Sequence, residues 1–142
     1  MTAVIERAAT LRLPGSPAQP HTIGVDRVLV LLGEVVAEVG EDHVLPCRGW
    51  ERGACASDYR YVWQGRPDCI TARVLVRLGV EVEYLLGVEG VPAGIVLREG
   101  MLYPLDLSDD AIRVLEVAQR AQDTGRTWGA VLAVASECAG AR

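Results

Sequence analysis

The sequence contains no phenylalanine, no lysine and no asparagine, so all 14 of its basic side chains are arginines. The missing residue types are those with AT-rich codons, which indicates a GC-rich genome rather than a functional choice. Long apolar runs are absent too: no stretch approaches the roughly 18 consecutive apolar residues of a membrane span, and residues 1–16 lack the basic-then-apolar plan of a signal peptide. These absences predict a protein without a membrane segment, located in the cytoplasm of a host cell.

Half of the 142 residues are hydrophobic and 23% are charged, a balance typical of a folded protein rather than a disordered one. The length fits one domain with one core. Residues 1–22 show little periodicity, and the prolines between Pro14 and Pro20 exclude a helix there. We therefore expect a flexible N-terminal arm over residues 1–22, followed by a single mostly helical domain over residues 23–142.

Apolar side chains recur at helical spacing in several segments of this domain. One helix is predicted from Asp26, whose carboxylate can cap it, to Gly40. A second is predicted to be capped by Asp68 and ended by Gly79, and a short third one runs from about Val82 to Leu86.

Further along the chain, Ser108 is a predicted N-cap, and the run from Asp123 to Gly125 separates its helix from a last one that begins at Thr127. Two helices so connected should pack antiparallel. Tyr59 to Trp63 is typical of a strand, with a turn at residues 64–67, whereas residues 91–103 fit either a hairpin or a helical turn followed by a loop. The expected fold is mainly α, with about five helices and a short β-hairpin in a single compact domain.

The net charge of -5 argues against general affinity for nucleic acid or for anionic membranes, which depends on many cations. The charge is uneven, however. Between Arg48 and Arg77 the sequence has six arginines and three acidic residues, whereas between Glu81 and Glu116 it has eight acidic residues and two arginines. Adjacent blocks thus have opposite sign.

The segment from Cys47 to Cys69 is rich in arginines and aromatic rings. Guanidinium groups bind phosphate bidentately, flat rings stack on bases, and a helix start favours an anion, although Asp68 already supplies a carboxylate there. In the alternative interpretation, Tyr59, Tyr61 and Trp63 pack onto the core while the arginines pair with Glu81, Glu83 and Glu89. The candidate residues for binding a protein partner or a nucleotide-like anion are Arg48, Trp50, Arg52, Arg60, Tyr61, Trp63 and Arg66.

A zinc site is a weaker hypothesis, formed by His43, Cys47, Cys55 and Cys69. Zinc ligands usually arrive as close pairs such as C-x2-C, but here three, seven and thirteen residues separate successive candidates. Buried, reduced thiols are favoured in the cytoplasm. We therefore expect no metal and no other cofactor, with zinc as the open alternative.

Residues 70–90 could form a helix-turn-helix, with Arg73 and Arg77 as its DNA contacts. Leu75 and Val76 oppose this, because they stand where such motifs need a small residue, and the acids of the would-be recognition helix would repel phosphate. DNA binding is therefore an alternative that the sequence disfavours.

Catalysis has little support. Cys69 at a helix start could act as a nucleophile with His43 or His21, but Asp68 would raise its pKa and the apolar helix face predicts burial. No phosphate loop, nucleophile elbow or His-Glu metalloprotease helix is present. We expect a protein that is not an enzyme.

Residues 61–90, YVWQGRPDCITARVLVRLGVEVEYLLGVEG, and residues 118–132, AQRAQDTGRTWGAVL, resemble small uncharacterised proteins encoded by bacteriophages of actinobacteria. The shared plan is a Tyr-Val pair, a Gly-x-Pro turn, a Cys that opens a helix, a Leu-Gly-Val break and a late Gln-Asp-x-Gly-x-x-Trp-Gly. The resemblance extends over about residues 26–135 and implies no activity.

Together these observations predict a non-enzymatic, phage-type accessory protein that binds a partner protein or a nucleotide-like anionic ligand through the arginine and aromatic segment. The alternatives are a helix-turn-helix DNA-binding regulator and a structural subunit of a phage particle. The high apolar content with few aromatics also predicts a homo-oligomer.

Overall fold

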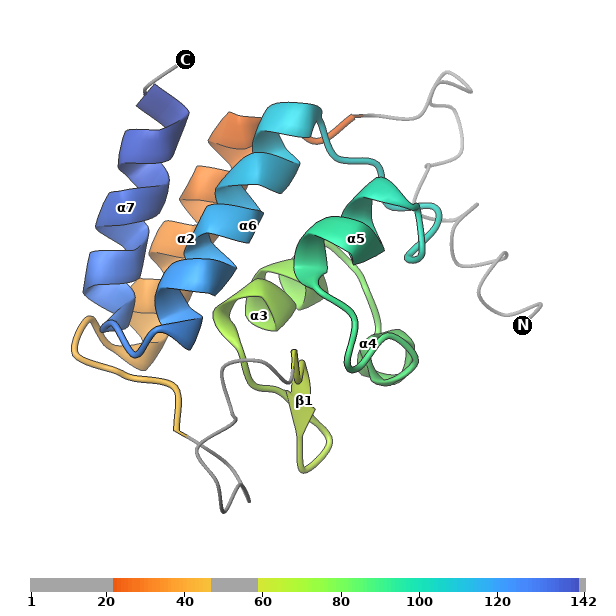
Figure 1. Ribbon diagram of the computed structural model, residues 1–142, viewed down its shortest axis with the longest axis horizontal. Helices are drawn as coiled ribbons and strands as arrows, with labels where there is room; N and C mark the ends of the chain where they lie inside the picture. Colours follow the sequence, from red (N-terminus) through yellow and green to blue (C-terminus); the bar gives the residue numbers. More distant parts are fainter. Residues whose placement is uncertain (1–21, 47–58, 141–142) are drawn as a thin grey trace.

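The computed structural model describes residues 22–46 and 59–140, which form six helices and one two-stranded antiparallel hairpin (Figure 1). This confirms the expected mainly helical fold with a short hairpin. The predicted N-terminal arm lies outside the described residues except for Thr22. The elements are α2 (Val25–Val39), β1 (Val62–Trp63), β2 (Arg66–Pro67), α3 (Ile70–Arg77), α4 (Val82–Leu86), α5 (Ala93–Arg98), α6 (Asp109–Asp123) and α7 (Trp128–Gly140).

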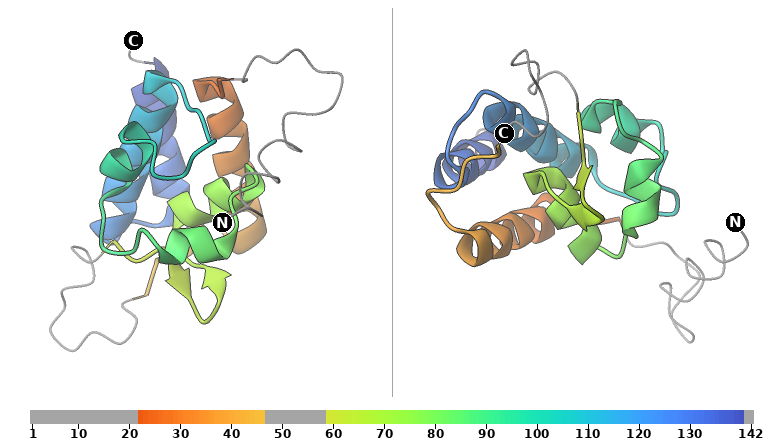
Figure 2. Two further views of the ribbon diagram at one scale, coloured as in Figure 1. Left: turned by 90° about the vertical axis from the view of Figure 1, so that its right-hand side faces the viewer. Right: turned by 90° about the horizontal axis from the view of Figure 1, so that it is seen from below.

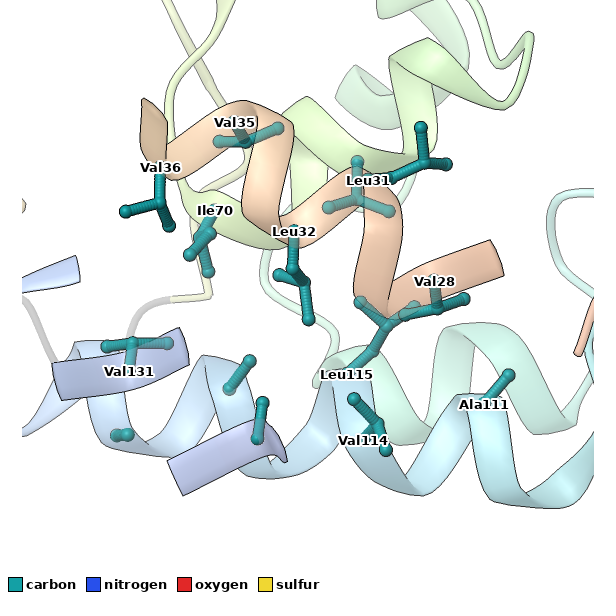
Figure 3. Packing of buried hydrophobic residues seen from close by; sticks show 14 of the residues in the cluster. Val28, Leu31, Leu32, Val35, Val36, Ile70, Ala111, Val114, Leu115 and Val131 are labelled. Carbon is teal, nitrogen blue, oxygen red and sulfur yellow. The ribbon is translucent and has the colours of Figure 1, made fainter. Parts of the chain in front are cut away.

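The three long helices α2, α6 and α7 lie side by side, and α7 runs antiparallel to α6 as the short connection between them predicts (Figures 1 and 2). Their facing sides bury Val, Leu, Ile and Ala side chains at helical spacing, together with Trp128 of α7, which has no exposed surface. In Figure 3, Leu32 of α2 points toward α6, and Leu115 of α6 points back toward α2. This first cluster is the main core.

Helix α3 lies between the first cluster and a second one. Ile70 and Val74 belong to the first cluster, whereas Ala72 and Leu75 belong to the second. The rest of the second cluster comes from the start of the hairpin, from the residue before α3, and from α4 and α5 with the turns that flank α5. These members are Tyr61, Val62, Cys69, Leu85, Val88, Ala93, Val96 and Leu102.

The helix ends follow the sequence only in part. Gly40, with φ 125°, ends α2, and Ser108 caps α6 by accepting the Ala111 N–H at 3.1 Å, both as predicted. The prediction that Asp26 caps α2 is wrong, because Gly24 is the N-cap. Asp26 lies in the first turn, where its negative charge still stabilises the helix by interacting with the positive end of the helix dipole.

The prediction that Asp68 caps α3 is also wrong, because the chain turns into the helix one residue later. Cys69 is the N-cap, and its sulfur accepts the Ala72 N–H at 3.3 Å. Asp68 is still extended chain here, and its N–H donates to the Tyr61 carbonyl at 2.9 Å.

The ambiguous stretch from residue 91 is helical rather than a hairpin: α5 starts after Pro92 and ends at Arg98. A short parallel bridge between Ile23 and Leu107 then joins the starts of α2 and α6. The longest helices of the described ranges have 15 residues, and none of the helices there is long and apolar enough to cross a membrane.

Candidate functional site

The hairpin of β1 and β2 carries the described part of the predicted binding segment. Val62 pairs with Pro67 and Trp63 with Arg66, so the tight turn consists of Gln64 and Gly65. Both turn residues have positive φ, 53° and 77°, which is the backbone of a type I′ turn. The turn places Arg66 at the exposed tip and leaves Trp63 half-buried beside it.

Tyr61 lies at the base of the hairpin and is 1% exposed. Its hydroxyl donates to the Val91 carbonyl, and burial raises the pKa of this phenol well above its ordinary value of 10.0. The ring is therefore not available to a partner at the surface. The assignment of Tyr61 to a binding surface is corrected in favour of the alternative in which it packs onto the core.

Glu89 fixes the same base of the hairpin. Its Oε2 accepts the backbone N–H groups of Tyr61 and Val62 at 2.7 and 2.8 Å. The next residue, Gly90, donates its N–H to the Tyr59 carbonyl at 3.1 Å. One oxygen of the Glu89 carboxylate thus binds backbone, and its pairing with an arginine stays a prediction.

The remaining candidates separate into two groups. Arg60 is half-buried directly before the hairpin and Arg66 is exposed at its turn, so the hairpin brings Arg60, Trp63 and Arg66 into one region of the chain. The other predicted contacts, Arg48, Trp50 and Arg52, lie outside the described residues.

The structure uses the weak zinc candidates that it describes for packing. The ring of His43 lies edge-on to Trp128 with the centroids 4.6 Å apart. Cys69 is fully buried as the cap of α3. Cys47 and Cys55 lie outside the described residues, and within the described ranges no three His, Cys, Asp or Glu residues come close enough to hold a metal ion.

Burial also decides the chemistry of Cys69. Together with the nearby charges of Asp123 and Asp68, it raises the pKa of the Cys69 thiol from 9.0 to about 12, although the hydrogen bond from Ala72 opposes the rise. A thiol that stays protonated is a poor nucleophile. The structure therefore supports the expectation that Cys69 does not serve catalysis.

We expect the Cys69 thiol to resist iodoacetamide at pH 8 in the folded protein. The higher pKa alone lowers its thiolate fraction about a thousandfold, and burial excludes the reagent. Peptide mapping by mass spectrometry checks this, with the half-exposed Cys138 as the internal control. Modification of Cys69 as fast as Cys138 without denaturant would contradict it.

Two N–H groups at the start of α3 that could bind an anion are engaged by side chains of the protein. The Ile70 N–H donates to Oε1 of Gln122 at 2.7 Å, and the Ala72 N–H donates to Cys69. Side chains of the protein thus occupy the positions that a phosphate would need.

The arginines of the predicted helix-turn-helix are likewise engaged within the protein. Arg77 pairs with Glu34 and Glu38 of α2, and Arg73 donates to the Asp68 carbonyl at 3.4 Å and lies 5.7 Å from the centre of the Trp128 ring. Binding of a DNA backbone would therefore compete with these contacts.

A cleft of about 260 Å³ lies between Tyr59, the start of α5 and the C-terminal half of α6. Sequence reasoning missed it. The signal that could have found it is the polar stripe on α6, where acidic, amide and basic side chains repeat at three- and four-residue spacing. The lining residues are Tyr59, Pro92, Ala93, Gly94, Glu116, Gln119, Arg120, Asp123 and Thr124.

Two polar groups of this cleft are unusual. Asp123 is half-buried, and burial raises the pKa of its carboxyl although the amides of Gln122 and Gln119 hold it partly down. Both amides donate to Oδ1, at 3.1 and 3.4 Å. Glu116, on the same wall, is instead bound by Arg98, whose Nη2 lies 2.9 Å from Oε1.

No family model, no curated protein and no solved structure matches this chain. The function must therefore be argued from the chain's own residues.

Proposed function

We propose that the chain is a non-enzymatic binding protein that docks one protein partner through the hairpin surface. We define this surface as Arg60, Trp63 and Arg66; the predicted contacts Arg48, Trp50 and Arg52 lie outside the described residues and stay predictions. The accessory role in a bacteriophage that the sequence resemblance implies is part of the proposal.

One observation carries it: the hairpin is anchored at its base and open at its tip. Tyr61 and Glu89 fix the base through hydrogen bonds, whereas Gln64, Gly65 and Arg66 are exposed at a turn that protrudes from the helical body (Figures 1 and 2). A pre-ordered loop with an arginine and a tryptophan suits protein recognition, because little ordering entropy is lost on binding and both residue types are frequent energetic hot spots.

A protein partner is favoured over a nucleotide-like anion. Small ligands bind in concave sites, but the cleft of about 260 Å³ contains neither Arg60 nor Arg66. The start of α3, the other candidate for an anion, is occupied by Gln122 and by the Cys69 cap. Arg66 beside the turn and Arg60 before the hairpin then meet an acidic surface rather than a phosphate pocket.

The other hypotheses rank lower. DNA binding would require Arg73 and Arg77, which are engaged within the protein. Self-association, as a homo-oligomer or as a subunit of a phage particle, stays a prediction, and it would appear in the experiment below as capture of the chain by itself.

We expect the double variant Arg60→Ala, Arg66→Ala to lose its partner. Truncating an arginine hot spot costs about 2 kcal/mol or more, so the affinity should fall at least about thirtyfold. Tagged wild-type and variant chains would capture the partner from a lysate of the native host, and calorimetry with the purified partner would give both affinities.

The matched control is Arg113→Ala, Arg126→Ala, which removes the same charge from exposed positions away from the hairpin. Circular dichroism would show that both variants remain folded. Equal affinity of the hairpin variant and the wild type would overturn the proposal.

A further inference from the structure

The cleft beside Tyr59 holds a carboxylate, Asp123, that no cation of the described ranges neutralises. Both amide donors of Asp123 go to Oδ1, and the ion pairs among the described residues do not include this side chain. Oδ2 therefore has no donor within the described part of the chain. A half-buried carboxylate in this situation is costly unless a donor arrives from outside.

Gln119 supplies a second acceptor at the same wall. Its side chain lines the cleft and is only 5% exposed, and its Nε2 is used on Asp123. Its Oε1 is buried and has no hydrogen-bond partner. A buried, unsatisfied carbonyl costs about 1–3 kcal/mol, so two independent acceptors at this wall lack donors.

The rest of the lining gives the cleft its shape. Gly94 lets Glu116 approach α5, since a Cβ on Gly94 would lie 1.7 Å from Oε2 of Glu116. Tyr59 contributes an aromatic side chain. Arg120 lies at the exposed side of the wall, and among the described lining residues it is the positive charge, which disfavours a cation.

We propose that this cleft binds a guanidinium group, supplied either by an arginine side chain of another protein or by a small free guanidine. A guanidinium is flat, carries five donors in a fixed fork, and stacks on aromatic faces, so it can satisfy Asp123 and Gln119 together beside Tyr59. The volume of about 260 Å³ is below that of pockets for drug-sized ligands, about 300–1,000 Å³, and fits one such group. This inference does not rest on the hairpin surface.

The test is an NMR titration of the ¹⁵N-labelled full chain with agmatine, a small guanidine. We expect shift changes centred on residues 92–94 and 116–124. Asp123→Asn should weaken binding at least about tenfold, because a hydrogen bond to a charged group is lost. Glu137→Gln, which removes one exposed carboxylate from α7, is the matched control and should bind like the wild type.

Asp123→Asn also separates a binding role from a structural one. Asparagine keeps an Oδ1 for both amide donors. Because the pKa of Asp123 is raised in the folded state, its ionisation lowers the free energy of unfolding as the pH rises through that pKa. At pH 7 the variant should therefore unfold at the same or a higher temperature while losing agmatine.

Two further comparisons complete the test. Arg120→Gln removes the like charge and should tighten agmatine binding, and butylamine, an ammonium without the planar fork, should bind more weakly than agmatine. N-acetyl-arginine methylamide distinguishes the sources: binding as tight as that of agmatine favours a protein side chain, and exclusion of its backbone favours a free guanidine. Absent or scattered shift changes, or equal affinity in Asp123→Asn, would overturn the inference.

Discussion

Replacing Trp128 by alanine is expected to lower the free energy of unfolding by about 3–5 kcal/mol. The side chain has no exposed surface and fills the space between α7 and the facing helices. Its backbone N–H also donates to the His43 carbonyl at 2.8 Å, and its ring meets the ring of His43. Since the free energy of unfolding of such domains is only about 5–15 kcal/mol, this single change removes a large share of the stability.

Urea unfolding followed by circular dichroism measures the effect. Trp128→Phe is the matched control: it keeps most of the ring volume and removes the indole N–H, which is buried without a partner. Its cost should stay below about 1.5 kcal/mol. A loss under 1 kcal/mol, on the order of an exposed substitution, in Trp128→Ala would show that α7 does not depend on this anchor.

Glu89→Ala should destabilise the protein by about 1.5–3 kcal/mol, the value of one hydrogen bond to a charged acceptor. The N–H groups of Tyr61 and Val62 share one oxygen of a half-buried carboxylate, so the two bonds are counted as one. Hydrogen exchange of the Tyr61 and Val62 amides should accelerate in the same variant. Both quantities can be measured on one labelled sample.

Glu83→Ala is the control for this change, since Glu83 is an exposed carboxylate on the neighbouring α4. Its effect should stay within about 0.5 kcal/mol. Unchanged exchange of the Tyr61 amide in Glu89→Ala would mean that the hairpin is held by other contacts. Weaker partner binding by Glu89→Ala, with Arg60 and Arg66 intact, would connect the anchored base to the proposed function.

Local pattern was enough to predict most helices. In α2 and α6 the apolar residues recur at helical spacing, which predicts a buried face whichever helix packs against it. Ser108 could be predicted as a cap because its hydrogen bond lies within the first turn of its own helix. Asp26 and Asp68 misled because an aspartate at the N-cap looks the same in sequence as one in the first turn, like Asp26, or one just before the cap, like Asp68. Which of these positions a residue takes depends on the backbone angles of the chain that leads into the helix.

Long-range contacts explain why the site was predicted less well than the fold. Glu89 lies 28 residues after Tyr61, and its hydrogen bonds to the Tyr61 and Val62 backbone depend on the path of the chain after α4. The ion pairs of the arginines are likewise long-range. Arg77 binds Glu38 of α2, 39 residues earlier, and Arg98 binds Glu116 of α6. Opposite charges in neighbouring blocks indicate attraction but do not specify partners.

Helix α3 is a wall common to both hydrophobic clusters, with Ile70 and Val74 on one side and Ala72 and Leu75 on the other. Neither cluster can lose its packing without exposing a face of the same eight-residue helix. We therefore expect the bundle and the smaller half around the hairpin to melt as one cooperative unit. A ligand that stabilises the cleft should for this reason slow hydrogen exchange at α2, on the far side of the molecule.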